Sequence, residues 1–456
     1  MRKLALYLVS AFLIIGCNGK VADSIITTDT PPRKAGQEDV LLLRCDPIPV
    51  VRVGFVGLGM RGPGAVARYT FLEGVEIKAL CDLYPERVAD AQKILIDKGL
   101  PKADEYSGED GWKQLCERDD IDLVYICTPW HLHTPIAVYA MQHGKHVAIE
   151  VPAATTLEEC WQLVNTAEQT RRHCMMLENC CYDFFEMATL NMAQHGLFGE
   201  VLHVEGSYIH DLRFLNFASE EEGGYQGYWR LNHHIAHTGD PYPTHGLGPV
   251  CQILNIHRGD RMNYLVSLST DQKGMTEYAK NKFGEGSALA DTTIALGDMN
   301  TTLIRTERGK SILIQHDVTS PRPYDRHHLI SGTKGYARKY PVQELAFEPN
   351  AHQAMPKEEF DAFMKEWEHP LTKEIGEKAR MVGGHGGMDF IMDYRLIYCL
   401  HNGLPLDEDV YDAAEWSAIG PLSEISVKNG SRPVQIPDFT RGAWNKVDGI
   451  KLYEKQ

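Results

Sequence analysis

Apolar runs alternate with amphipathic stretches between residues 50 and 178 of this chain. The apolar runs are short, as buried strands are, and the stretches between them repeat their apolar positions with the period of a helix. The predicted strands are residues 51–56, 75–80, 123–127, 146–149 and 174–177. The predicted helices are residues 62–71, 86–97, 135–143 and 157–170. Repeated strand–helix units predict an α/β domain with a doubly wound parallel sheet over residues 50–178.

The pattern changes after residue 178, where longer runs alternate apolar and polar positions. Such runs predict strands with one buried face, as in an antiparallel or mixed sheet. The expected strands are residues 200–209, 264–268, 287–296, 301–305 and 311–317, and the expected helices are residues 388–402 and 409–427. We therefore predict a second, α+β domain over residues 179–456 with an open, mostly antiparallel sheet.

Three loops of the second domain are rich in glycine, histidine and tyrosine, namely residues 223–248, 317–328 and 383–387. Loops of that composition and length are uncommon in compact domains unless they carry function. We therefore expect much of the site to come from these loops.

A glycine motif follows the first predicted strand. The residues Gly57, Gly59 and Gly62 form a G-x-G-x-x-G, with Met60 and Arg61 inside it, and Asp82 follows about 20 residues later at the end of another strand. The first glycine permits a tight turn, the second allows a pyrophosphate to approach the backbone, and the third lets the helix pack closely. Asp82 can accept hydrogen bonds from ribose hydroxyls and would repel a 2′-phosphate. The motif predicts bound NAD rather than NADP.

Ligands of parallel sheets bind beyond the carboxyl ends of the strands. Thr128, Trp130 and His131 follow one predicted strand, Glu150 follows the next, and Asn179 follows the last. We therefore expect these five residues to contact the dinucleotide.

The N-terminus has the layout of an export signal. Arg2 and Lys3 precede an apolar run over residues 4–15, and Gly16-Cys17 follows it. The run is too short to span a membrane. Its end resembles a bacterial lipobox, which predicts a signal peptide over residues 1–16, a lipid anchor on Cys17 and a tether over residues 17–49. The mature protein is expected on the periplasmic face of a membrane or on the cell surface.

Charge and cysteine spacing exclude several classes of protein. The net charge is −16 without any block of lysine and arginine, so the electrostatic footprint of a nucleic-acid binder is absent. The cysteines show no spacing typical of a disulfide framework or a zinc site, and we expect mostly buried thiols. His233, His234, His237 and His245 invite a metal interpretation, but no carboxylate-rich set lies near them in the sequence. We expect no metal.

The order of parts resembles the glucose–fructose oxidoreductase and inositol dehydrogenase (Gfo/Idh/MocA) superfamily, in which a sheet domain covers the nicotinamide. That superfamily usually carries Glu-Lys-Pro after the fifth strand, with lysine in proton transfer, whereas this chain has Glu150-Val151-Pro152. Where the chain differs from the usual pattern of the superfamily, it resembles one branch, glycoside hydrolase family 109. This resemblance extends from about residue 50 to the end of the chain. Its motifs stand here as Glu150-Val151-Pro152, Glu178-Asn179-Cys180-Cys181-Tyr182, Tyr242-Pro243-Thr244-His245-Gly246, Arg322-Pro323-Tyr324-Asp325 and Gly384-His385-Gly386-Gly387-Met388-Asp389.

The resemblance implies an NAD-dependent α-N-acetylgalactosaminidase that retains the anomeric configuration. It implies oxidation at carbon 3 of the sugar, loss of the proton on carbon 2, departure of the aglycone, addition of water and re-reduction. This route needs proton acceptors that work near neutral pH, such as histidine or a hydrogen-bonded tyrosine. The implied catalytic residues are His245, Tyr182, Glu150 and Tyr324. The implied substrate-binding residues are Tyr182, Arg213, Tyr242, His245, Tyr324 and His385.

Two other functions remain open at this stage. The chain would be an NAD-dependent sugar or cyclitol oxidoreductase if it consumed free cofactor, and a glycan-binding lipoprotein if it kept the dinucleotide as a structural element only. Val151 disfavours the first, and the titratable loop residues disfavour the second. The pair of carboxylates that most glycosidases use is not recognisable, which is consistent with the redox route. The aglycone and the oligomeric state, including a homo-oligomer, are left open.

Overall fold

The computed structural model describes residues 25–450 and residue 452. Its first sheet has six parallel strands in the order β3-β2-β1-β4-β5-β6, the order of a dinucleotide-binding domain. These strands are β1 (Val51–Val56), β2 (Val75–Asp82), β3 (Asp104–Ser107), β4 (Leu123–Ile126), β5 (His146–Ile149) and β6 (Cys174–Met176). The predicted α/β domain is confirmed, and β3 is a strand that the sequence pattern did not predict.

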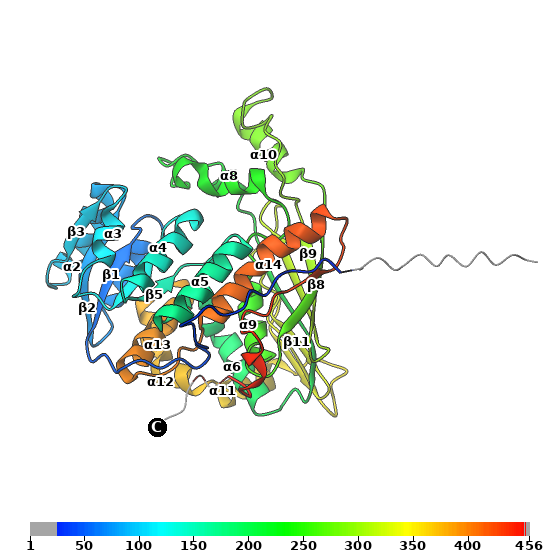
Figure 1. The fold of residues 1–456 in the computed structure, drawn as a ribbon. Helices are drawn as coiled ribbons and strands as arrows, with labels where there is room; N and C mark the ends of the chain where they lie inside the picture. Colours follow the sequence, from blue (N-terminus) through cyan, green and yellow to red (C-terminus); the bar gives the residue numbers. More distant parts are fainter. Residues whose placement is uncertain (1–24, 451, 453–456) are drawn as a thin grey trace, which may run out of the picture.

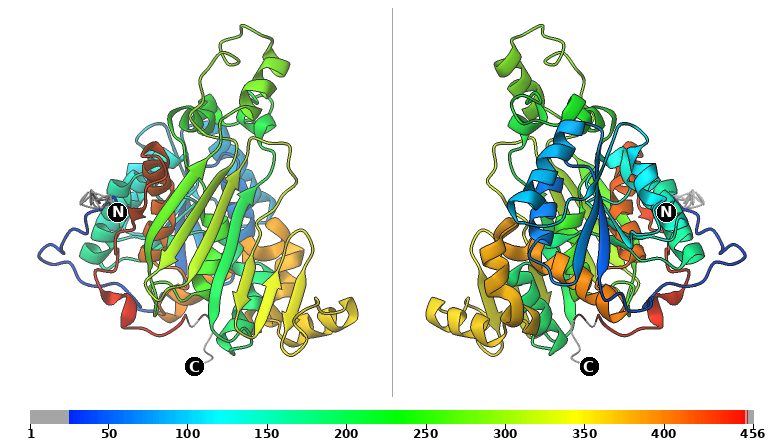
Figure 2. Two further views of the ribbon diagram at one scale, coloured as in Figure 1. Left: turned by 90° about the vertical axis from the view of Figure 1, so that its right-hand side faces the viewer. Right: turned by 90° about the vertical axis from the view of Figure 1, so that its left-hand side faces the viewer.

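The second sheet has eight strands in the order β13-β12-β11-β7-β10-β9-β8-β14. Only β7 and β10 run parallel among its named pairs, so the sheet is mostly antiparallel, as predicted. Its strands are β7 (Val201–Ile209), β8 (Met262–Ser269), β9 (Asn300–Thr306), β10 (Ser311–Asp317), β11 (Leu329–Gly332), β12 (Gly335–Arg338), β13 (Glu344–Phe347) and β14 (Val434–Gln435). One face lies open to solvent, with Leu202, Leu268 and Leu303 exposed (Figure 2).

Helices cover both faces of the first sheet and the inner face of the second (Figure 1). Those of the first domain are α1 (Gly62–Tyr69), α2 (Pro85–Asp97), α3 (Gly111–Cys116), α4 (Trp130–Gln142) and α5 (Leu157–Thr170). The remaining α-helices are α6 (Phe184–Gln194), α7 (Arg213–Asn216), α8 (Trp229–Ala236), α9 (Thr244–Ile253), α10 (Gly274–Phe283), α11 (Lys357–Glu366), α12 (Pro370–Val382), α13 (Met388–Asn402) and α14 (Val410–Lys428). Short 3₁₀ helices are η1 (Asn179–Tyr182), η2 (Gln226–Tyr228), η3 (His385–Gly387) and η4 (Ala443–Asn445).

The two C-terminal helices α13 and α14 return to the first domain. Arg68 of α1 pairs with Asp393 of α13 at 2.7 Å between Nε and Oδ2, and both side chains are buried. The backbone N–H of Ala153 donates to Oγ of Ser417 on α14 at 3.1 Å. The end of the chain therefore joins the two sheets into one body, with the first domain's strand ends beside the second domain's loops.

The expected tether is wrong for its described part, residues 25–49. Val40 is 2% and Leu43 is 8% exposed, and Ile26 forms a β-bridge with Val434. Arg33 pairs with the fully buried Glu168 at 3.0 Å. This segment packs on the body because its apolar positions find partners there. Cys17 and the predicted signal peptide lie outside the described residues.

The strand expected over residues 287–296 is also wrong. Its backbone N–H groups bond elsewhere: those of Ala295 and Leu296 donate to the carbonyl groups of Ile235 and His234 on α8. Ala290, Ile294 and Leu296 are buried, with Leu296 at 0% exposure, so the alternating pattern reflects burial of these side chains without a neighbouring strand. Helix α4 differs too, since it begins at Trp130 rather than at residue 135 and contains Pro135.

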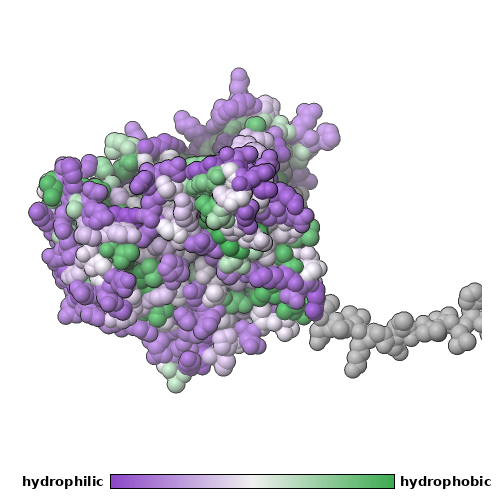
Figure 3. All heavy atoms as spheres, turned by 90° about the horizontal axis from the view of Figure 1, so that it is seen from above, coloured by the Kyte–Doolittle hydropathy of each residue, from purple (hydrophilic) through white to green (hydrophobic). Residues whose placement is uncertain are grey.

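The surface seen from above is mainly hydrophilic, and its hydrophobic side chains lie in small separate patches (Figure 3). Among the residues that the structure describes, no helix is long and apolar enough to cross a membrane. The ten cysteines of this part are free thiols, and eight of them are buried, which confirms the expectation from their spacing.

Candidate active site

The glycine loop between β1 and α1 has the geometry that a dinucleotide needs. Gly57 has φ of +93°, and a Cβ there would lie 2.6 Å from the carbonyl carbon of Cys127. A Cβ at Gly62 would lie 2.1 Å from the carbonyl oxygen of Gly57. A Cβ at Gly59 would meet nothing nearer than Nη1 of Arg87 at 3.5 Å, which leaves open space over the loop. Gly57 thus allows the tight turn, Gly62 the close packing of the helix and Gly59 the approach of a ligand, as the motif predicts.

Asp82 stands at the end of β2 and braces the glycine loop. Its Oδ2 accepts a hydrogen bond from the backbone N–H of Leu58 at 2.6 Å, and its Oδ1 accepts one from Tyr84 N–H at 3.0 Å. The side chain is 6% exposed. One acid therefore fixes the loop and also presents a carboxylate beside the expected ribose position, so the residues present fit a bound NAD.

A polar network joins the glycine loop to η3 and α13. Nε of Arg61 donates to Oε1 of Glu150 at 3.0 Å, and its Nη1 lies 3.3 Å from Oδ2 of Asp389. Asp389 also accepts from Nδ2 of Asn179 at 2.5 Å and lies 3.0 Å from Nδ1 of His385. The network around Asp389 therefore contains four predicted site residues, Arg61, Glu150, Asn179 and His385. Asp389 itself stands in one of the family motifs but was not a predicted site residue.

Burial alone would raise the pKa of the Asp389 carboxyl, which is fully buried. The hydrogen bond with His385 and the charges of Arg61 and Arg68 more than offset it and hold the pKa below its ordinary value. Asp389 is therefore a fixed anion that orients the Arg61 guanidinium under the glycine loop. His385 is half exposed, so it borders the site from outside.

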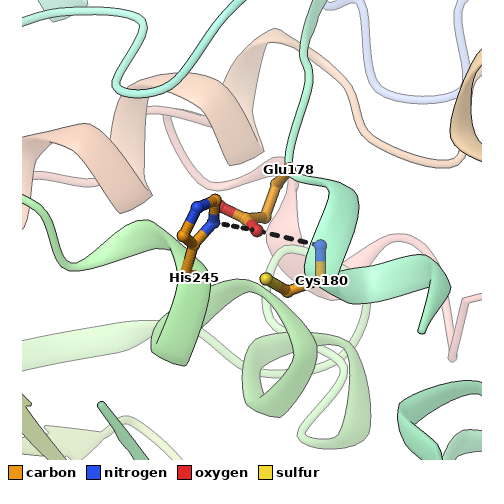
Figure 4. A group of neighbouring side chains, drawn as sticks. All are labelled: Glu178, Cys180 and His245. Atoms are coloured by element: carbon orange, nitrogen blue, oxygen red, sulfur yellow. Dashed lines mark hydrogen bonds and ion pairs between the residues drawn. The ribbon is translucent and has the colours of Figure 1, made fainter. Parts of the chain in front are cut away.

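His245 lies in the first turn of α9 and points at the end of β6. Its Nδ1 is 2.7 Å from Oε1 of Glu178 (Figure 4). Its Nε2 is 3.4 Å from the hydroxyl of Tyr242. Glu178 lies two residues after the end of β6 and is fully buried, and its Oε1 also accepts a hydrogen bond from the backbone N–H of Cys180 at 3.1 Å. Burial would raise the pKa of Glu178, but the interactions with His245, with the Thr244 hydroxyl and with the N–H of Cys180 outweigh it and lower the pKa. Glu178 is an anion that orients the imidazole.

Close packing of α9 on β7 sets this geometry. A Cβ at Gly206 would lie 2.1 Å from the carbonyl oxygen of Gly246, and one at Gly246 would lie 2.3 Å from the backbone nitrogen of Ser207. A Cβ at Gly248 would meet Cγ of Glu178 at 2.7 Å. The helix can carry His245 to Glu178 because glycine stands at these positions.

An aromatic wall surrounds a buried arginine next to His245. The rings of Tyr242 and Trp130 stack with centroids 5.7 Å apart, and Tyr208 lies 4.6 Å from Tyr242. Cζ of Arg230 lies 5.0 Å from the Trp130 ring and 4.8 Å from the Tyr242 ring, and its Nη1 donates to the hydroxyl of Tyr225 at 2.8 Å.

Arg230 is 5% exposed, and its Nε and Nη2 have no hydrogen-bond partner in the described part of the chain. Leaving buried donors unsatisfied is costly, so these N–H groups are suited to the oxygens of a ligand. The same charge acts on its neighbours. Burial and the charges of Arg230 and His245 lower the pKa of His210 to about 4, so this histidine is neutral near pH 7.

Tyr324 lies at the outer edge of the wall and is 42% exposed. Its ring centroid is 5.0 Å from that of His210, which in turn lies 4.7 Å from Tyr208. The Tyr208 ring is 5.4 Å from His245. Tyr324 is thus connected to the His245 side of the site through two rings, at a place where solvent and ligand can reach it.

Two predicted site residues lie elsewhere. Tyr182 is fully buried, and its hydroxyl donates to Oδ2 of Asp407 at 3.3 Å. Burial and the nearby acids raise its pKa well above the ordinary value, and its hydroxyl faces Asp407 rather than the His245–Glu178 pair, so the structure does not support the predicted role in proton transfer. Arg213 pairs with Asp211 at 2.7 Å and lies over Tyr278, away from the His245–Glu178 pair. Arg230 is instead the arginine that lies against the rings beside His245.

The remaining expected cofactor contacts lie around the strand ends. Met60 is 56% exposed at the tip of the glycine loop, and His131 is exposed in the first turn of α4. Thr128 has a buried hydroxyl oxygen without a partner in the described residues. Trp130 instead faces the second domain, where it stacks on Tyr242.

The histidines considered for a metal do not converge on one point. The rings of His233 and His237 stack at 4.5 Å, and His237 pairs with Glu424, whereas His245 pairs with Glu178.

The sequence placed Glu178 in a motif but indicated no role for it. Its position directly after the strand predicted over residues 174–177 was the available signal. Arg230, Tyr208 and His210 gave no local signal, because their roles depend on contacts between separate elements.

The fold and this site define an NAD-binding protein of the oxidoreductase type. Residues 51–178 match the family described as "Oxidoreductase family, NAD-binding Rossmann fold". A solved levoglucosan dehydrogenase in complex with NADH and L-sorbose has the same fold, with a TM-score of 0.64, 20% identity and coverage of 86% of this chain and all of that one.

Two further comparisons specify the family. Residues 182–446 match the model "Glycosyl hydrolase 109, C-terminal domain". The chain is 62% identical over 410 residues to an α-N-acetylgalactosaminidase of Bacteroides fragilis, covering 90% of this chain and 96% of that one. It is 57% identical to a glycosyl hydrolase family 109 protein of Phocaeicola vulgatus, with coverage of 90% and 99%. The chain belongs to glycosyl hydrolase family 109, and the family predicted from the sequence is confirmed.

Proposed function

We propose that this protein is an exo-acting α-N-acetylgalactosaminidase that uses tightly bound NAD and retains the anomeric configuration. The similarity to the Bacteroides fragilis enzyme supports the substrate. The glycine loop and Asp82 support the cofactor. The single observation that carries the catalytic part is the His245–Glu178 pair at the junction of the two domains, beside an arginine with unpaired donors.

His245 is the group that removes and returns the proton on carbon 2 of the sugar. Glu178 holds Nδ1, so the proton is exchanged at Nε2, the nitrogen next to Tyr242. Bound NAD supplies reversible hydride transfer at carbon 3, which makes the proton on carbon 2 acidic. Loss of that proton drives out the aglycone, and the same base returns a proton after water adds.

Tyr242 takes the second position near the reaction, which sequence reasoning gave to Tyr182. Burial raises the pKa of Tyr242, so its hydroxyl stays protonated near neutral pH and acts as a donor. Arg230 and Tyr324 bind sugar oxygens, the first from inside the wall and the second from its edge. Glu150 and Arg61, which are hydrogen-bonded to each other beside the glycine loop, would contact the bound dinucleotide.

Chromogenic N-acetylhexosaminides, assayed without added NAD, test this function. Release from the α-N-acetylgalactosaminide alone, with no net reduction of cofactor, is expected. Turnover in heavy water should give N-acetylgalactosamine with deuterium at carbon 2 and the α configuration in the first product. Hydrolysis without deuterium there would rule out elimination.

The same assay separates the two alternatives. A sugar or cyclitol oxidoreductase would reduce added NAD stoichiometrically, and a glycan-binding protein would release no chromophore. Val151, in the position of the superfamily's lysine, is 5% exposed and has no proton to exchange, which favours the hydrolase.

Tight retention of NAD is part of the proposal, because a cofactor that returns to its starting state in each cycle need not leave. Denatured protein should release NAD, and Asp82→Ala should lower its content, since the carboxylate also braces the glycine loop. Release of NADP would contradict our interpretation of Asp82.

We further propose that the protein is exported and anchored to the membrane through a lipid on Cys17, with its site on the periplasmic face or the cell surface. The apolar run before Gly16-Cys17 supports this. Labelled fatty acid should be incorporated into the parent protein and not into Cys17→Ala. Equal labelling of both would contradict the anchor.

A homo-oligomer remains part of the proposal. The open face of the second sheet exposes Leu202, Leu268 and Leu303, which is the kind of surface that a second copy would cover. Light scattering of the purified protein should give a mass above that of one chain, and a monomeric mass would contradict it.

A further inference from the structure

One set of three metal-ligating side chains converges within the described part of the chain. Glu178, Cys180 and His245 each offer one ligand atom, and these atoms all lie within 4.8 Å of one another. Figure 4 shows that the thiol of Cys180 and the imidazole of His245 approach the Glu178 carboxylate from η1 and α9. The three side chains come from two elements held by the close packing of α9, so the set is preformed.

The Glu178 carboxylate is incompletely satisfied. Its Oε1 accepts hydrogen bonds from His245 and from the N–H of Cys180, whereas its buried Oε2 has no hydrogen bond of good geometry and the carboxylate has only the Thr244 hydroxyl as a further neutral partner. A buried carboxylate oxygen without a donor is unfavourable, and most such oxygens in proteins have a hydrogen bond or an ion. This oxygen is an independent sign that the set accepts a further cationic partner.

The ligand types match one class of ion. Thiolate, imidazole and carboxylate are the donors of zinc sites, and three protein ligands with a fourth open position form the usual accessible arrangement. One divalent cation with a thiolate and a carboxylate is electrically neutral, which suits a buried site. His245 has the exposed part of the set, at 13%, so an ion would enter past the imidazole.

We propose that Glu178, Cys180 and His245 bind one thiophilic divalent cation such as Zn²⁺, and that the bound ion inhibits the enzyme. On binding, the Cys180 thiol releases its proton to solvent, the neutral imidazole donates a nitrogen lone pair, and no group is oxidised or reduced. The ion replaces the hydrogen bond between His245 and Glu178. The inhibition rests on the proposed function of His245, whereas the binding does not.

Cadmium is the probe for binding, because a cadmium–thiolate bond absorbs in the ultraviolet. The NAD-containing parent protein should show this band with one equivalent of Cd²⁺, and Cys180→Ser should lose it. The matched control is Cys181→Ser, which changes the next buried thiol and should keep the band. Cys180→Ala replaces Cys180→Ser if the hydroxyl prevents folding. A band absent from the parent, or equal in the Cys180 variants, would overturn the site.

Zn²⁺ at buffered free concentrations is the probe for inhibition, with each variant compared with its own activity in chelator. The parent and Cys181→Ser should be inhibited reversibly. The concentration for half inhibition should rise roughly tenfold or more in the Cys180 variants, since one ligand is lost. A cadmium band without inhibition by Zn²⁺ would overturn the inhibitory role. A parent protein inactive on the sugar in chelator would overturn the proposed function instead, while the cadmium band would still decide the site.

Discussion

Two histidine–glutamate pairs in this molecule differ in what surrounds them. His245 bonds Glu178 through Nδ1 and leaves Nε2 beside a tyrosine hydroxyl. His257, which lies just beyond α9, is 0% exposed and contacts Glu415 through Nε2, while its Nδ1 lies 3.3 Å from Asp412. In the first pair, one ring nitrogen of the histidine is not held by an acid and lies where ligand can reach it. In the second pair, acids hold both ring nitrogens.

The second pair is a fixed ionic cluster. Burial lowers the pKa of His257, but the charges of Glu415 and Asp412 outweigh it and raise the pKa to about 10. Arg258 completes the cluster, with Nη2 2.7 Å from Oδ2 of Asp412. The comparison teaches that the same two residue types serve catalysis or stability according to the number of carboxylates and the access of solvent.

The largest expected effect is on stability, from His257→Asn. Asparagine tolerates the backbone at this position, where φ is +64°. Removing the imidazole leaves the buried Glu415 carboxylate without its cation, whereas Asp412 keeps Arg258, and the loss of such a partner costs about 3–5 kcal/mol. Urea unfolding should show this loss, while turnover per folded molecule stays at the parent value. If His257→Asn lost turnover but kept its stability, the His257–Glu415 pair would serve catalysis as the His245–Glu178 pair does.

This stability difference should depend on pH. The folded pKa of His257 is raised to about 10 from an ordinary value of 6.5, so the cation contributes fully below pH 6.5. The contribution is lost as the pH rises through about 10. The gap in unfolding free energy between parent and His257→Asn should therefore narrow from neutral pH to pH 10. A constant gap would show that His257 does not titrate in this range.

The next effect is on turnover, from His245→Ala. A positioned acid–base contributes on the order of 10²-fold or more, and the loss should appear in kcat with NAD content and unfolding free energy near those of the parent. His257→Asn is the matched control, because it removes the other paired imidazole. Near-normal turnover of His245→Ala would exclude it from proton transfer.

A smaller effect is expected from Glu178→Gln, because Glu178 positions the imidazole and does not touch the substrate. Loss of a charged hydrogen bond of about 1.5–3 kcal/mol corresponds to roughly 10- to 100-fold in kcat. The loss should appear in kcat, while KM, NAD content and unfolding free energy stay near the parent values. A fall in unfolding free energy that accounts for the lost turnover would indicate a structural role only.

The sequence predicted the local parts of this site and missed the long-range ones. The glycine loop and Asp82 were recognisable because each glycine's role depends on one strand–turn–helix unit. Glu178 and His245 are 67 residues apart, and their contact depends on the packing of α9 on β7. Strand ends identify positions near a ligand but not the direction of each side chain, which is why Tyr182 was chosen in place of Tyr242.

Arg213 and Arg230 illustrate the same limit. Both stand in polar segments after β7, and only contacts distinguish them. Arg213 is neutralised by Asp211, two residues away, whereas Arg230 is enclosed by rings from α4 and from the loops around α8. The families of both domains were recognisable from the loop motifs, and periodicity predicted the parallel sheet and the strands β7, β8, β9 and β10 of the second sheet, but not β11, β12, β13 and β14. The strand expected over residues 287–296 is wrong, because burial of alternate side chains does not require a neighbouring strand.

The smallest expected effect comes from Tyr182→Phe. This variant tests a third pair, Tyr182 and Asp407, whose hydroxyl is closed to substrate. The Tyr182 hydroxyl donates to Asp407, and that carboxylate keeps a two-point pair with Arg395 at 2.7 and 2.8 Å when the hydroxyl is removed. The expected loss is therefore about 1 kcal/mol of unfolding free energy. Turnover, retention of configuration and deuterium uptake at carbon 2 should match the parent, because no substrate can reach a fully buried hydroxyl.

Tyr242→Phe, which removes the hydroxyl beside Nε2 of His245, is the matched variant that should lower turnover. A fall on the order of 10²-fold in Tyr182→Phe would restore Tyr182 as a proton carrier and show that the site opens during the reaction.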